Sequence, residues 1–91
     1  MAGILEKNID EILSYLEKII NNLAKDVFDN LEIEGGFQGV DDFLQNQFDV
    51  RLENLLVSKN SSIHHLESAM KNKIIQKKQS VFKKISEQYK N

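Results

Sequence analysis

The sequence predicts an all-α protein, an antiparallel helical hairpin that pairs into a four-helix bundle. Two long segments repeat apolar residues at helical spacing, and one glycine-rich stretch at residues 34–39 separates them. The 91 residues include no proline and no cysteine, and they leave room for one helical domain spanning residues 1–91. Hydrophobic residues make up 41% and charged residues 29%, a balance typical of chains that fold.

The first helix is predicted over about residues 4–33. At 100° per residue its apolar side chains fall in a sector about 140° wide, and its charged side chains lie outside that sector. Gly35 and Gly36 then end the helix, because glycine readily adopts the left-handed conformation of a helix C-terminus. The stripe consists of Leu5, Ile9, Ile12, Leu13, Leu16, Ile19, Ile20, Leu23, Ala24, Val27 and Leu31.

The second helix is predicted over about residues 40–88. The stretch 58–62 reads Ser-Lys-Asn-Ser-Ser, a composition that favours caps and turns, so it is a candidate break that would give three helices. The apolar residues after it nevertheless keep the helical phase of those before it, which favours a continuous or bent helix. Such an arm overhangs the first helix by roughly 25 to 30 Å. We therefore expect a second copy or a partner to cover the overhang.

Charge divides the chain into two halves of opposite sign. Residues 1–57 carry twelve acidic and four basic side chains, a net charge of −8, and residues 58–91 carry eight basic and two acidic ones, a net charge of +6. The distal lysines point to several sides of their helix, which does not match the single basic face of a nucleic-acid-binding helix. We expect the two halves to be complementary to each other, and we expect protein partners, not nucleic acid.

No residue pattern points to catalysis, a metal or a cofactor. His64 and His65 are adjacent, so on a helix they point about 100° apart and cannot converge on one metal as residues four apart can. Residues 35–39, Gly-Gly-Phe-Gln-Gly, lack the lysine and hydroxyl that a phosphate-binding loop needs. The carboxylates are expected on exposed helix faces. We therefore predict a non-enzymatic protein with no catalytic residue, metal ligand or cofactor.

The lengths of the apolar runs also indicate where in the cell the chain is expected. The longest run is three residues, 55–57, far below the roughly 20 needed to span a bilayer, so no membrane span is expected. The N-terminal residues show no basic segment followed by an apolar stretch, so we expect no cleaved signal peptide. The chain is predicted to be cytoplasmic, or secreted without such a peptide.

The residues of the predicted turn resemble a sequence motif of a known protein family. Residues 34–40 read Glu-Gly-Gly-Phe-Gln-Gly-Val, which places the aromatic-x-Gly triplet Phe37-Gln38-Gly39 between two long amphipathic segments. The chain resembles the small Trp-x-Gly proteins of type VII secretion, the early-secreted-antigen-like family. The resemblance implies helical hairpins that form four-helix dimers and act as folded substrates, targeting partners or chaperone-like accessory proteins. Phe37 replaces that family's tryptophan, and Tyr89 is followed only by Lys90 and Asn91, so the family's Tyr-x-x-x-acid export signal is not met.

Two functions follow as hypotheses. The first is a helical protein–protein interaction module that docks against a copy of itself or another helical protein. The second is a small regulatory protein, of the antitoxin, immunity or phage type, whose acidic first helix occupies a basic site on a target and inhibits it. The predicted partner interface comprises Phe37, Gly39, Phe48, Leu52, Leu55, Leu66, Met70 and Ile74.

Overall fold

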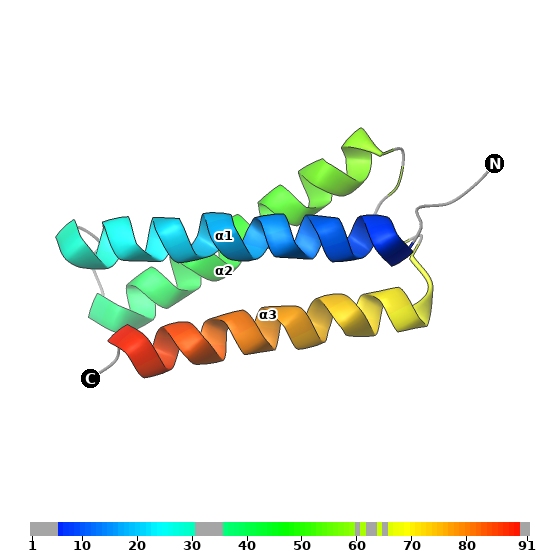
Figure 1. Cartoon of the computed structure of the whole chain (residues 1–91). Helices are drawn as coiled ribbons and strands as arrows, with labels where there is room; N and C mark the ends of the chain where they lie inside the picture. Colours follow the sequence, from blue (N-terminus) through cyan, green and yellow to red (C-terminus); the bar gives the residue numbers. More distant parts are fainter. Residues whose placement is uncertain (1–5, 31–35, 60, 62–63, 65, 90–91) are drawn as a thin grey trace.

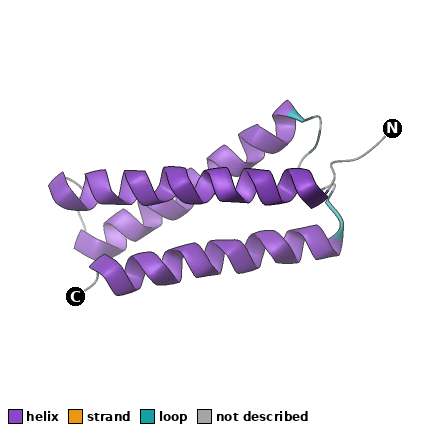
Figure 2. Ribbon diagram, in the orientation of Figure 1, coloured by secondary structure: helices purple, strands orange, loops and turns teal. Residues whose placement is uncertain are grey.

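The chain forms an up-down-up bundle of α-helices. The computed structural model describes residues 6–30, 36–59, 61, 64 and 66–89. Over these residues the elements are three helices and no strand: α1 (Glu6–Asn30), α2 (Gly36–Ser58) and α3 (Ser68–Tyr89). Helices α1 and α3 run in the same direction and α2 runs against them (Figures 1 and 2). The all-α prediction is confirmed, and the bundle measures 46 × 20 × 18 Å.

The predicted two-helix hairpin is wrong, because the chain reverses direction between Ser58 and Ser68. The Ser58 hydroxyl donates to the carbonyl of Leu55 at 2.7 Å, and the backbone N–H groups of Lys59 and Ser61 both donate to the carbonyl of Leu56, at 3.0 and 2.9 Å. These bonds satisfy carbonyls that a continuing helix would have used. The composition of residues 58–62, which favours a turn, therefore indicated the path of the chain correctly, and the continuity of the apolar phase across these residues did not. The overhanging arm that favoured a second copy is not formed by the described residues.

The predicted helix boundaries also change. Helix α1 lies within the predicted range, of which residues 4–5 and 31–33 are outside the described part of the chain. Helix α2 begins at Gly36, not at residue 40, so Phe37-Gln38-Gly39 forms its first turn. Gly36 has φ +61°, a left-handed conformation that favours glycine, and the Gln38 amide donates to Asp42 one turn later at 2.9 Å. The aromatic-x-Gly triplet is thus helical and does not form the loop itself.

The hydrophobic core is built on α1. Helices α2 and α3 each contact α1 far more than they contact each other. Of the predicted α1 stripe, Ile19, Leu23 and Val27 are half-buried, and residues 5 and 31 lie outside the described residues. The buried side chains are Ile9, Ile12, Leu13, Leu16, Ile20 and Ala24 from α1, Val40, Leu44, Phe48, Leu52 and Leu56 from α2, Leu66 from the link, and Ile74, Val81, Phe82 and Ile85 from α3.

The buried residues of α2 recur every fourth position, from Val40 to Leu56. A row of this spacing is inclined to the helix axis, so a helix that buries it crosses its neighbour at an angle. Figure 1 shows α2 crossing α1 obliquely while α3 lies more nearly alongside α1. The C-terminal end of α2 and the N-terminal end of α3 therefore diverge. No helix among the described residues is both long and apolar enough to cross a membrane.

The core assignment is tested at Leu16, which is fully buried in the middle of α1. Leu16→Asp should abolish the helical circular dichroism signal at room temperature, because an unpaired buried carboxylate costs several kcal/mol in a domain of modest stability. The matched control is Tyr15→Asp, since Tyr15 is the preceding residue and is 54% exposed. Equal melting temperatures for the two variants would contradict the assigned core face.

Candidate partner-binding surface

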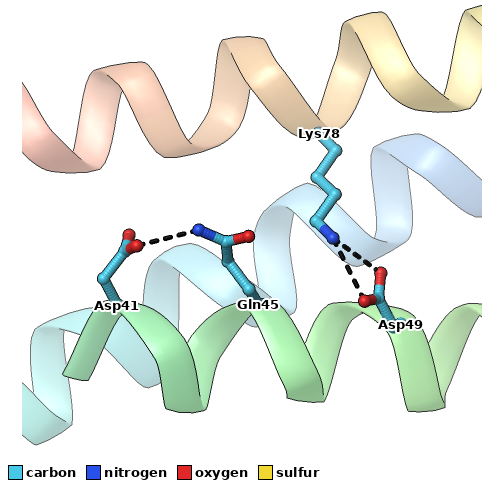
Figure 3. Close-up of polar contacts among 4 residues, drawn as sticks. All are labelled: Asp41, Gln45, Asp49 and Lys78. Carbon is cyan, nitrogen blue, oxygen red and sulfur yellow. Dashed lines mark hydrogen bonds and ion pairs between the residues drawn. The ribbon is translucent and has the colours of Figure 1, made fainter. Parts of the chain in front are cut away.

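Ion pairs attach the basic helix α3 to the acidic helices. Lys73 Nζ lies 2.6 Å from Asp10 Oδ1 and 3.5 Å from Glu6 Oε2, and Lys77 Nζ lies 2.7 Å from Glu17 Oε1. On the other side of α3, Lys78 reaches across to Asp49 of α2 at 2.9 Å (Figure 3). The complementarity expected from the charge halves is thus present within one chain, with ion pairs from α3 to both α1 and α2.

One of these contacts changes a pKa. The hydrogen bond from Lys73 to Asp10, with the negative charges of Asp10 and Glu6, raises the pKa of Lys73 above its usual value of 10.5. A raised folded-state pKa stabilises the fold at all pH values below 10.5, and this stabilisation is lost as the pH rises through the folded-state pKa. The Lys73 ammonium remains charged throughout the neutral range, so its contact with Asp10 is not a physiological pH switch.

Three aromatic rings, one from each helix, close the end of the bundle near the C-terminus. The ring of Phe28 stacks on that of Tyr89 with centroids 4.4 Å apart and planes 9° apart, and on that of Phe37 with centroids 5.7 Å apart. Stacked aromatic pairs can contribute stability beyond that of burial alone. Phe37, predicted as an interface residue, is therefore half-buried in an intramolecular contact. Tyr89, the residue compared with the export signal, belongs to the same stack.

Half of the predicted interface, four of its eight residues, lies inside the chain. Phe48, Leu52, Leu66 and Ile74 are buried in the core, with at most 6% of each residue exposed. Buried side chains offer no docking surface unless the bundle opens. The remaining predicted residues are partly accessible: Phe37 in the aromatic stack, Gly39 in the first turn of α2, and Leu55 and Met70 packed against the core.

Ile75 is the apolar side chain that the sequence reasoning missed. It is 52% exposed, although it follows the buried Ile74. Two hollows meet at Ile75: one of about 250 Å³ is lined also by His64, Lys71 and Ile74, and one of about 390 Å³ is lined also by Gln45, Lys78, Gln79 and Phe82. We call this surface the Ile75 groove. The signal in the sequence was the Ile74-Ile75 pair, because adjacent helical residues point about 100° apart. This signal is not decisive, since both members of the pairs Ile12-Leu13 and Val81-Phe82 are buried.

The walls of the Ile75 groove come from two helices. Gln45, on the α2 wall, donates to Asp41 at 2.8 Å, and the Lys78–Asp49 pair bridges the two walls one turn further along α2 (Figure 3). On the α3 wall, Lys71 has no ion-pair partner among the described residues. The groove thus combines an exposed apolar centre with an available cation near one end.

A larger hollow of about 430 Å³ lies between α1 and α3. Most of the residues that line it are of polar or charged types, and the charged groups among them, Asp10, Lys73 and Lys77, already take part in the ion pairs described above. Across the described part of the chain, no group of three or more His, Asp or Glu side chains is placed to hold a metal ion. His65, the neighbour of His64, lies outside the described residues. The Ile75 groove is therefore the candidate site.

Comparison with protein-family models, curated proteins and solved structures gives no significant match to this chain.

The aromatic stack is tested by a double-mutant cycle on Phe28→Leu and Tyr89→Leu. The two rings should show a coupling free energy of about 0.5–1.5 kcal/mol in urea unfolding, the range found for aromatic pairs. Phe28→Leu paired with Val50→Ala is the control, because Val50 is 48% exposed on α2 and is not part of the aromatic stack. A coupling near zero for the aromatic pair would show that the C-terminal end of α3 does not pack on α1.

Proposed function

We propose that this chain is a non-catalytic protein–protein interaction module that binds an amphipathic helix of a partner protein in the Ile75 groove. The observation that carries the proposal is the half-exposed Ile75, where a hollow between α2 and α3 meets a hollow lined by α3 and His64. Helix recognition commonly places a few apolar anchors of one helix in a groove of another protein. The groove is framed by α2, α3 and His64.

The charged residues at the groove indicate which charge the partner helix carries. Lys71 stands at the groove without an ion pair among the described residues, and Lys78 is held to Asp49 on the opposite wall. A partner helix with an acidic residue beside its apolar anchors complements Lys71. Such a charge mainly speeds association and sets orientation, while apolar burial supplies most of the affinity.

The size of the groove favours a transient complex. Stable interfaces bury about 1,200–2,000 Å² in total, whereas weak and transient ones bury less. The groove presents one strongly exposed apolar side chain, with Ile74 and Phe82 behind it largely buried. We therefore expect modest affinity and reversible binding.

The two other sequence hypotheses receive less support. Three acids of α1, Glu6, Asp10 and Glu17, form ion pairs with α3, so the acidic face needed by an inhibitor of the antitoxin or immunity type is partly occupied. A type VII secretion role rested on a hairpin with a single bend, whereas the described chain bends twice. Both remain predictions, and neither is included in the proposal.

The proposal is tested by capturing binding proteins from the native host on immobilised chain. Ile75→Asp should weaken retention of a specific partner by roughly 10- to 100-fold, because burial of an isoleucine side chain contributes about 1.5–3 kcal/mol. Val50→Asp is the matched control, since Val50 is similarly exposed on α2 and does not line the groove. Circular dichroism should show that both variants remain folded.

A second probe identifies the contact directly. A photo-crosslinking residue in place of Ile75 should become linked to the captured protein, and the same residue in place of Val50 should not. Equal retention by Ile75→Asp and wild type, or crosslinking from position 50 alone, would refute the groove as the binding surface.

A further inference from the structure

The α2 wall of the Ile75 groove holds a glutamine whose amide is held in one orientation. Gln45 donates an N–H of its Nε2 to Asp41 Oδ2 at 2.8 Å, one turn back along α2. Figure 3 shows the oxygen of the Gln45 amide turned away from Asp41, toward Lys78. Because Gln45 lines the hollow of about 390 Å³, it offers a hydrogen-bond acceptor to a ligand in that hollow.

The α3 wall of the same hollow holds a second glutamine. Gln79 is exposed, and its amide makes no hydrogen bond among the described residues. A side-chain amide carries two donors as well as an acceptor. Ile75 and Phe82, which also line the hollow, supply apolar surface. The hollow therefore offers an acceptor from one helix and donors from the other.

Lys78 is the charged side chain among the described residues that line this hollow, and its charge is already compensated. Its Nζ lies 2.9 and 3.1 Å from the two carboxylate oxygens of Asp49, and 5.9 Å from the centroid of the Phe48 ring. A carboxylate entering the hollow would compete with Asp49, and a cation would be repelled by the ammonium group. A neutral group with both a donor and an acceptor avoids both costs.

The residues along the α3 wall define the spacing that a bound helix must match. Lys71, Ile75 and Gln79 follow one another at intervals of four residues, so they form one row on the surface of α3. Lys71 and Gln79 are thus about 12 Å apart along the helix axis, at 1.5 Å per residue. On a partner helix that lies along this row, residues seven apart span about 10 Å and share one face.

We propose that the hollow between Gln45 and Gln79 binds the side-chain amide of an asparagine or glutamine on the partner helix. The amide donates to Gln45 Oε1 and accepts from Gln79 Nε2. An apolar side chain here would remove water from both glutamines without replacing their hydrogen bonds. The partner helix then carries an acidic residue at Lys71, an amide seven residues away, and an apolar residue between them at Ile75. This inference rests on the proposed function and adds a residue type and a spacing to it.

The test is a selection from a displayed library of alanine-rich helical peptides in which the positions of one face are randomised. Against the wild-type chain, we expect enriched peptides to pair an acidic residue with an amide seven residues away, with an apolar residue between them. Against Gln45→Leu, the amide should lose its enrichment while the acidic and apolar residues keep theirs. The matched control is Gln38→Leu, which should select the wild-type pattern. Gln38 donates to Asp42 at 2.9 Å, also within α2, and does not line the hollow.

Calorimetry on one enriched peptide measures the contribution of the amide. Replacement of the amide residue by alanine should weaken binding to the wild-type chain by about 2- to 10-fold, the range expected for hydrogen bonds of this kind. The same replacement should leave binding to Gln45→Leu unchanged. Circular dichroism should show that Gln45→Leu and Gln38→Leu have the same helical content as the wild-type chain.

The possible failures separate this inference from the proposed function. Enrichment of acidic and apolar residues without an amide would overturn the amide site and leave the groove intact, as would a lysine, arginine or carboxylate enriched in its place. A selection that gives no peptide above background, or one that Ile75→Asp does not change, would refute the groove and the amide site together.

Discussion

The fold depends on the burial of one broad apolar face of α1. Both α2 and α3 pack on this face, to which α1 contributes Ile9, Leu16 and Ile20, all wholly inaccessible. Removal of apolar surface from water stabilises the fold by about 25 cal/mol per Å², and α1 is the helix whose buried face is shared with both of the others. The width of the α1 stripe follows from this position, because a helix with one neighbour needs only a narrow seam.

Electrostatic contacts select among the ways in which helices can cover α1. Apolar stripes alone tolerate rotation and sliding, whereas Lys73, Lys77 and Lys78 bind carboxylates on α1 and α2 from opposite sides of α3. These pairs are partly exposed, so each contributes little free energy. Their effect is on orientation, and the Phe28–Tyr89 stack fixes the far end of the same helix.

The buried residues of α1 could be predicted from the spacing of apolar residues in the sequence. The reversal of the chain between α2 and α3 could not. Every described buried residue of α1 belongs to the predicted stripe, because apolar spacing reports directly which face leaves water. The apolar residues keep their helical spacing across residues 58–62, and this led to the wrong prediction of one continuous helix. Such spacing indicates which side of a helix is apolar, but it carries no information on whether the helix continues. The local bonds of Ser58, Lys59 and Ser61 decided the reversal, and such bonds are visible only in the folded chain.

The candidate site was less predictable than the core. Phe48, Leu52, Leu66 and Ile74 were assigned to a partner because the hairpin left them uncovered, and the reversal covers them within one chain. Ile75 was missed because its exposure depends on the divergence of α2 and α3, a tertiary property set by the crossing of α2 over α1.

The edge-to-face contact between Phe48 of α2 and Phe82 of α3, with centroids 6.2 Å apart, reports the chain reversal most directly. In one continuous helix these residues would lie about 50 Å apart, at 1.5 Å per residue. We predict a strong nuclear Overhauser effect between the two rings in the monomeric fraction at low concentration. Its absence there, with helical contacts running unbroken through residues 58–68, would contradict the three-helix fold of the single chain.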